Sequence, residues 1–194
     1  MRSVFLVGAV SAGVFVLTAS AVAAGTARDV DERLRERFVR ARSPRLDALS
    51  AVVTPLTSPA LLIACSLATA VRFRRLGATV WAPIASAPFL AMIAGRCFTA
   101  TMPRQYAPTS SDGKPEVSFP SGHTTGATAE ALTISYILRR RRLLGRGPAM
   151  AMLLVPLIGG LNRLYRDRHW SSDIVAGLSA GSAIAAGLAI TSQG

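Results

Sequence analysis

Apolar residues gather along this chain in long runs, and short polar segments separate one run from the next. The longest runs have about the 20 residues that a helix needs to cross the hydrocarbon core of a bilayer. Arginine, proline and glycine are concentrated in the polar segments, as expected of helix ends and turns. The pattern predicts an all-α fold, a bundle of six membrane-spanning helices at residues 3–24, 59–71, 76–95, 123–138, 148–161 and 171–190.

The segment between the first two runs has a different pattern. Between residues 28 and 45, charged side chains alternate with apolar residues at helical spacing: Val30, Leu34, Phe38 and Val39. A helix with one apolar and one charged face is typical of the membrane interface. Ser43 and Pro44 form a cap and first-turn pair, so a second helix is expected to begin there. We therefore expect residues 26–56 to be interfacial helices.

The first run, residues 1–25, allows two interpretations. Its small residues near the end suit cleavage of a secretory signal, whereas its length suits a membrane span. We favour a retained helix, because the chain that follows is also typical of a membrane protein. Residues 57–192 then supply spans two to six, and residues 1–194 form a single integral membrane domain.

The charge adds an orientation to this layout. The formal net charge of +12 comes from 22 basic and 10 acidic residues. The arginines lie in short groups at the ends of apolar runs, which argues against a nucleic-acid-binding surface. The groups at residues 72–75 and 139–146 follow spans two and four, and the positive-inside rule assigns these ends to the cytoplasm. We expect a multi-pass protein of the cell (inner) membrane, with the loops after spans three and five facing the periplasm or exterior.

The chain has two histidines, His123 and His169, and they lie in those two same-side loops. A single histidine in a membrane protein is usually a packing residue, but two on one face, beside arginine, serine or glycine, favour a functional site. At the start of a helix, backbone amides and the helix dipole attract anions, so Ser121 and Gly122 are candidate anion ligands. His123 is a candidate proton donor. The alternative for Ser121 is simple capping of the helix.

The second loop carries Arg163, His169 and Asp173. His169 and Asp173 are four residues apart, which on a helix places them on one face within hydrogen-bonding reach. An acid bound to one imidazole nitrogen fixes the tautomer and leaves the other nitrogen as a nucleophile. Arg163 can neutralise a phosphate with a fork of donors.

Both motifs resemble signatures of the type 2 phosphatidic acid phosphatase (PAP2) superfamily of integral membrane lipid phosphatases. The run from Pro120 to His123 matches the second signature, and Arg163, His169 and Asp173 match the third in spacing. Asn162 replaces the serine that usually precedes the arginine. The resemblance covers most of the chain and implies a bundle with a PAP2/haloperoxidase-like core.

The first signature, a lysine six residues before Arg-Pro, matches only in part. Arg104 stands at the arginine position, but Gln105 replaces the proline and Cys97 occupies the lysine position. Arg96, one residue earlier, is a candidate replacement for the lysine. The other candidates for the missing charge are Arg166 and Arg168.

The resemblance implies a phosphohistidine mechanism. His169 attacks phosphorus, His123 protonates the leaving oxygen, and Asp173 orients His169. The phosphoryl oxygens are bound by Arg104, Ser121, Gly122, Arg163 and Arg96. Arginines and amides can stabilise the charge of a phosphoryl group, so neither a metal nor a cofactor is required.

The implied substrate is a lipid phosphate or diphosphate, either polyprenyl or glycerophospholipid. The alternatives are a non-catalytic membrane protein that binds anionic lipid or transports a solute, and a lipid phosphotransferase. Cys65 and Cys97 lie at different depths of their runs, which argues against a disulfide. Glu130 follows His123 by nearly two turns, so we expect it to point inward and either pair with an arginine or stay protonated.

Overall fold

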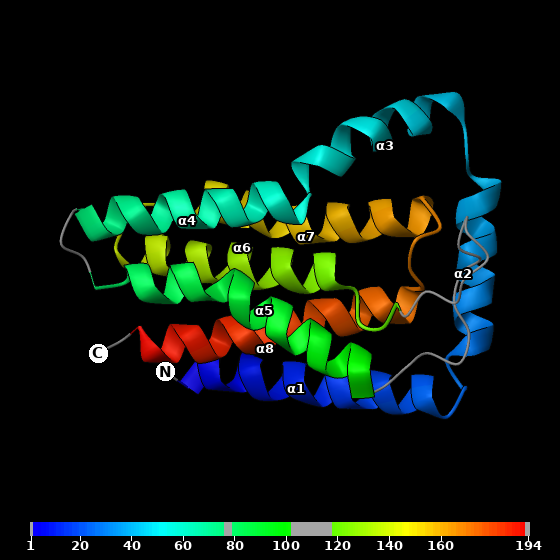
Figure 1. The fold of residues 1–194 in the computed structure, drawn as a ribbon, viewed down its shortest axis with the longest axis horizontal. Coiled ribbons are helices and arrows are strands. Elements are labelled where there is room, and N and C mark those ends of the chain that lie inside the picture. Colours follow the sequence, from blue (N-terminus) through cyan, green and yellow to red (C-terminus); the bar gives the residue numbers. More distant parts are fainter. Residues whose placement is uncertain (1, 76–78, 102–117, 193–194) are drawn as a thin grey trace.

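The computed structural model describes residues 2–75, 79–101 and 118–192, and this part of the chain is helical, without strands. Most of the helices run along one axis, α2 lies across one end of the bundle, and α3 slants from α2 to α4 (Figure 1). This arrangement confirms the all-α bundle that the sequence predicts. The helices are α1 (Arg2–Ala23), α2 (Arg28–Arg40), α3 (Pro44–Leu56), α4 (Pro59–Arg75), α5 (Trp81–Thr101), α6 (Gly122–Arg140), α7 (Arg146–Tyr165) and α8 (Ser171–Thr191).

Among the described residues, five stretches are long and apolar enough to cross a membrane, against the six expected from sequence. They are Arg2–Ala23, Pro44–Arg75, Trp81–Phe98, Arg146–Tyr165 and Ser171–Thr191. The difference concerns α6, which runs along the bundle with the others but carries many polar and small residues (Figure 1). Most α6 residues are buried against neighbouring helices, so α6 presents little surface that would have to be apolar toward lipid.

Helix α3 also differs from the expectation. The sequence places it in the interface, whereas its apolar residues make it continuous with α4 as a candidate span. The predicted start is confirmed, because the Ser43 hydroxyl accepts a hydrogen bond from the Leu46 amide at 3.4 Å and Pro44 occupies the first turn. Helix α5 contains Pro88 in its interior.

Helices α6 and α8 approach closely at Gly177 and Gly181, two glycines of α8 that are four residues apart. A Cβ atom at Gly177 would lie 2.9 Å from the Ser121 carbonyl oxygen, and one at Gly181 would lie 2.5 Å from the Thr125 carbonyl oxygen. Both distances are too short for any side chain. The small residues therefore set the spacing of the two helices whose first turns follow the two histidine loops.

Helix α1 belongs to the same packed core. Phe15, Ala19 and Val22 of α1 are buried in one cluster with Phe119 and two alanines of α8. A Cβ at Gly8 would lie 3.1 Å from Ala186 of α8. The first apolar run thus packs along the length of the last one.

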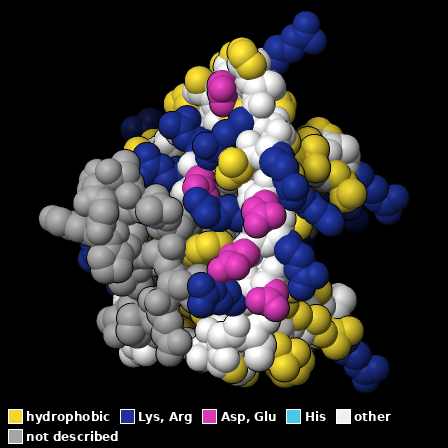
Figure 2. Space-filling view, turned by 90° about the vertical axis from the view of Figure 1, so that its right-hand side faces the viewer, with side chains coloured by type: hydrophobic (Ala, Val, Ile, Leu, Met, Phe, Trp, Pro, Cys, Tyr) yellow, Lys and Arg dark blue, Asp and Glu magenta, His cyan; other side chains and the backbone are white. Residues whose placement is uncertain are grey.

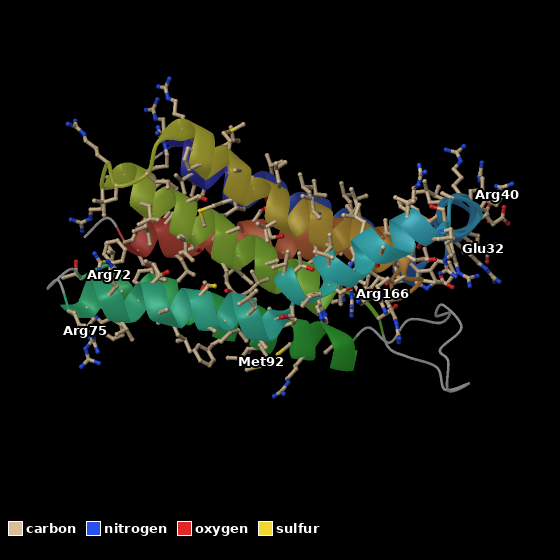
Figure 3. All side chains as sticks on the ribbon, turned by 90° about the horizontal axis from the view of Figure 1, so that it is seen from above. Glu32, Arg40, Arg72, Arg75, Met92 and Arg166 are labelled. Carbon is tan, nitrogen blue, oxygen red and sulfur yellow. The ribbon has the colours of Figure 1, made fainter. Side chains whose placement is uncertain are left out.

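The charged side chains gather at the two ends of the bundle. Figure 3 places Arg72 and Arg75 at one end and Glu32, Arg40 and Arg166 at the other. The second end carries arginines interspersed with acids (Figure 2). The histidine loops lie at this mixed end, opposite the arginines that close α4 and α6, as the parity of the predicted spans requires.

Candidate active site

Ser121 ends the loop before α6 and caps the helix. Its hydroxyl accepts from the Thr124 amide at 3.4 Å and from the Thr124 hydroxyl at 3.0 Å. Ser121 is fully buried, and its backbone amide donates to the Asp173 carbonyl oxygen at 3.1 Å. The capping alternative therefore describes the contacts of Ser121 in this structure, and the same residue joins the two histidine loops through the backbone.

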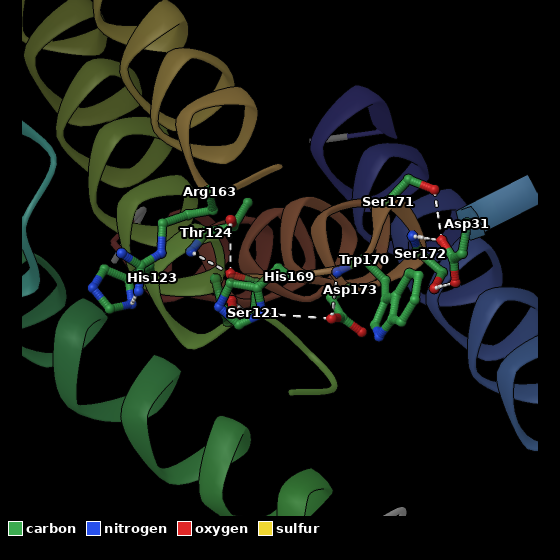
Figure 4. A network of polar contacts seen from close by, with 11 residues as sticks. Asp31, Ser121, His123, Thr124, Arg163, His169, Trp170, Ser171, Ser172 and Asp173 are labelled. Atoms are coloured by element: carbon green, nitrogen blue, oxygen red, sulfur yellow. Dashed lines mark hydrogen bonds and ion pairs between the residues drawn. The ribbon is translucent and has the colours of Figure 1, made fainter. Parts of the chain in front are cut away.

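Gly122 and His123 form the first turn of α6. No described protein atom comes within 4 Å of a Cβ built on Gly122, so the missing side chain leaves open space there. The His123 Nδ1 lies 3.5 Å from a terminal nitrogen of Arg163, in the last turn of α7 (Figure 4). His123 and Arg163, two candidate site residues from different helices, thus lie next to each other.

His169 and Asp173 meet at the start of α8. The Asp173 carboxylate is fully buried; its Oδ2 accepts from the Trp170 amide at 2.9 Å and lies 3.4 Å from His169 Nδ1 (Figure 4). The helix begins at Ser171, so His169 precedes it and does not share a helix face with Asp173 as the spacing suggested. The Asp173 side chain reaches His169 because it folds back over the start of the helix. As a result, Nδ1 of His169 faces the carboxylate.

Both histidines line one cavity of about 570 Å³. Its wall also includes Gly122 and Arg163, and α4 and α5 supply mainly apolar side chains: Pro59, Leu62, Ile63, Pro88, Ala91 and Met92. Arg96 of α5, the candidate replacement for the signature lysine, lines the same cavity. The cavity therefore joins a basic, histidine-bearing end to a mainly apolar wall.

The remaining candidates for phosphate binding are placed differently. Arg104 lies outside the described residues. Arg166 is exposed and donates to the Thr54 hydroxyl at 3.3 Å. Arg168 is exposed, and neither Arg166 nor Arg168 is among the described residues that line the cavity. Of the alternatives for the missing lysine, the geometry favours Arg96.

Two residues that the sequence did not single out hold the loop around His169. Asp31 of α2 is 1% exposed and accepts hydrogen bonds from the Ser171 hydroxyl at 2.6 Å, the Ser172 amide at 2.8 Å and the Ser172 hydroxyl at 2.6 Å. A carboxylate at the start of α8 also interacts favourably with the helix dipole. Asp31 thereby fixes the start of α8 immediately after His169 (Figure 4).

Arg35, one turn after Asp31, binds the other side of the loop. Its guanidinium donates two hydrogen bonds of 2.6 Å to the Asp167 carboxylate and lies 5.7 Å from the centre of the Trp170 ring. The hydrogen bonds with Asp167 raise the pKa of Arg35, so it stays charged. Trp170 is buried, at 4% exposure. The only sequence signal was the four-residue spacing of Asp31 and Arg35, which puts them on one helix face.

The face of α2 that packs against the bundle is mixed, because the charged Asp31 and Arg35 lie beside the partly buried Leu34 and Phe38. Val30 is 55% and Val39 40% exposed, while Asp31 faces the bundle. Helix α2 is amphipathic, as predicted, but its charged residues make the contacts with the loop that carries His169. Hydrophobic periodicity alone could not reveal this contact.

No group of three or more metal-ligating side chains occurs in the described ranges. Cys65 and Cys97 are both free cysteines in this structure. Glu130 points inward and lines the cavity, as expected, and among the described residues its hydrogen-bond partner is Ser66.

Comparisons with known proteins agree with this geometry. The model of the PAP2 superfamily matches residues 56–193. A crystal structure described as the first transmembrane PAP2 type phosphatidylglycerolphosphate phosphatase, from Bacillus subtilis, is similar with a TM-score of 0.71 at 20% sequence identity, over 94% of this chain and 90% of that chain. No curated protein matches the sequence. Residues 56–193 contain both histidine motifs, and the chain therefore belongs to the PAP2 superfamily and is a multi-pass membrane phosphatase of the PAP2 type.

Proposed function

We propose that this phosphatase hydrolyses a membrane lipid phosphate or diphosphate through a phosphohistidine intermediate, at the extracytoplasmic face. The observation that carries the proposal is the shared cavity, because one space is lined by both histidines, two arginines and an apolar wall. The phosphate would lie at the basic end, and the lipid chain would lie along the apolar side chains of α4 and α5.

The reaction begins at His169. With Nδ1 turned toward Asp173 at 3.4 Å, Nε2 is the ring nitrogen that can attack phosphorus. The N–P bond forms as the bond from phosphorus to the lipid oxygen breaks, and His123 delivers a proton to that oxygen. Arg163 neutralises the phosphoryl oxygens through charge-assisted hydrogen bonds, with Arg96, Gly122 and Arg104 as further candidate ligands.

Water completes the cycle. With the lipid alcohol gone, His123 is neutral and can accept a proton from a water molecule that attacks the phosphohistidine. The N–P bond breaks, inorganic phosphate leaves, and His169 and His123 return to their starting states. An alcohol that takes the place of water would make the enzyme a phosphotransferase, so the test includes an acceptor alcohol.

The outward orientation rests on charge. Arg72, Arg74 and Arg75 close α4, and Arg139 and Arg140 close α6, at the end opposite the histidines. The positive-inside rule places such ends in the cytoplasm.

The test is release of phosphate by purified protein in detergent, with EDTA, from glycerolipid and polyprenyl phosphates. We expect turnover that persists with EDTA and falls at least about a thousandfold in His169→Ala, since loss of a nucleophile leaves only binding effects. Arg141→Ala, at the opposite end, is the matched control and should retain activity. Equal activity of His169→Ala and the control would refute the phosphohistidine route, and loss on chelation would refute a metal-free reaction.

A further inference from the structure

A buried carboxyl group lies in the wall of the active-site cavity, away from the histidines. Glu130 of α6 is 4% exposed and lines the cavity. The Ser66 hydroxyl of α4, fully buried, donates to its Oε2 at 2.7 Å. The phosphoryl-transfer steps above have no use for this acid, although burying an acid among helices is costly.

The carboxyl group lies one helical turn from the reaction centre. Helical side chains lean toward the N-terminus of their helix. Oε1 of Glu130 accordingly lies 3.8 Å from the position of a Cβ on Gly126. Gly126 is three residues after His123, or about 4.5 Å along the axis. Gly126 lines the cavity, and its lack of a side chain leaves the path to Oε1 open.

At this depth of the cavity, the carboxyl group of Glu130 would face the part of a lipid substrate that follows the phosphate, and this part differs between lipid classes. In a polyprenyl phosphate that part is hydrocarbon, which would cover the carboxyl group without forming a hydrogen bond to it, and this is unfavourable. In a glycerolipid phosphate, the hydroxyl or ester oxygens of the glycerol lie a few bonds from phosphorus, roughly 5 Å away. A second phosphate would bring negative charge toward an acid.

We propose that Glu130, held by Ser66 and reached past Gly126, forms a subsite for an uncharged oxygen of the substrate, a hydroxyl or an ester, next to the phosphate. The subsite makes the enzyme selective for glycerolipid phosphates over polyprenyl phosphates. This inference rests on the proposed hydrolysis of lipid phosphates and goes beyond it by choosing the substrate class.

Three substrates test whether the oxygen bound at Glu130 belongs to a hydroxyl or to an ester. Diacylglycerol phosphate offers esters, 1-alkylglycerol phosphate offers a hydroxyl without an ester, and polyprenyl phosphate offers neither. The measured quantity is the ratio of kcat/KM for each glycerolipid to that for polyprenyl phosphate. Wild-type protein should give ratios above one, and Glu130→Leu should lower at least one ratio about tenfold, the effect of one lost hydrogen bond. The ratio that falls identifies a hydroxyl or an ester as the bound group.

Two further variants test whether a change in the ratio comes from misfolding. Glu130→Gln keeps hydrogen-bonding capacity and should preserve more of the ratio than Glu130→Leu does. Gly126→Ala keeps the carboxyl group but places a methyl group at ordinary contact distance from Oε1, so it should lower the same ratio. Thermal unfolding of each variant in detergent measures the structural contribution separately.

The outcomes distinguish the two proposals. Turnover of lipid phosphates with ratios that do not change in Glu130→Leu or Gly126→Ala would make Glu130 a structural residue and overturn the subsite alone. Wild-type preference for polyprenyl phosphate would overturn it as well. Absence of wild-type turnover on every lipid phosphate would refute the proposed function together with the subsite.

Discussion

Replacing Asp31 with alanine should destabilise the loop that carries His169. The carboxylate is 1% exposed and accepts three hydrogen bonds from Ser171 and Ser172, at 2.6 to 2.8 Å. A hydrogen bond to a charged group contributes about 1.5–3 kcal/mol, and bonds to one carboxylate are not additive. Asp31→Ala leaves the buried Ser172 amide without this acceptor, so we expect a loss of roughly 3–5 kcal/mol in the free energy of unfolding, as for other buried charged networks.

The assay is thermal unfolding in detergent, combined with phosphate release well below the transition. A chain of this length loses about 2–4 °C in Tm per kcal/mol, so Asp31→Ala should unfold about 10 °C lower. Its kcat should fall more than its KM rises, because Asp31 orients the nucleophile's loop and does not line the described cavity. Asp31→Asn keeps the shape and one acceptor oxygen, so it should lose less than half as much stability.

Glu32 provides the matched control. It carries the same charge on the same helix, but its pair with Arg28 is exposed, with 47% and 60% of the two side chains accessible. Glu32→Ala should change stability by less than about 0.5 kcal/mol. If Asp31→Ala unfolded like wild type, or if Glu32→Ala lowered Tm and kcat equally, the role assigned to the contact between α2 and the His169 loop would be wrong.

Three other predictions follow from the packing and the charges. Gly181→Ala places a Cβ 2.5 Å from a carbonyl oxygen of α6 and should lower the free energy of unfolding by at least about 1–3 kcal/mol. Gly187→Ala, whose Cβ would have no atom within 4 Å, should not destabilise α8. Unfolding temperatures of the two variants in detergent make the comparison, and equal values would contradict the close packing. Arg163→Lys keeps the charge but loses the fork of donors, so kcat/KM for phosphate release should fall about 10- to 100-fold; an unchanged value would remove Arg163 from phosphate binding. In a background without the native cysteines, a membrane-impermeant thiol reagent should label Arg42→Cys on intact cells and Arg141→Cys only after permeabilisation; the reverse pattern would overturn the proposed orientation.

Patterns among residues close in sequence predicted much of the fold. Apolar runs located the helices, and Ser43 and Ser121 located two helix starts, because capping depends on residues close in sequence. Helix α6 was expected from the sequence, but it is not among the stretches long and apolar enough to cross a membrane, because a helix enclosed by other helices needs no apolar surface.

The candidate site was likewise predicted only in part from the sequence. The motifs nominated His123, Arg163, His169 and Asp173 as candidate site residues, and the parity of the spans put both histidine loops at one end of the bundle, since each span reverses the direction of the chain. Local spacing explained the approach of His169 to Asp173 incorrectly, because the helix begins only after His169.

Tertiary structure decided which side chains surround those residues. Arg35 and Asp167 are 132 positions apart, Ser66 and Glu130 are 64 apart, and no local periodicity relates either pair. In the sequence, Asp31 does not differ from the other acids of α2. In the structure, α2 lies across the end of the bundle and buries Asp31 against α8. Sequence determines the helices and their ends, because those depend on neighbouring residues and on the bilayer; the contacts that orient His169 and line its cavity depend on how the helices pack.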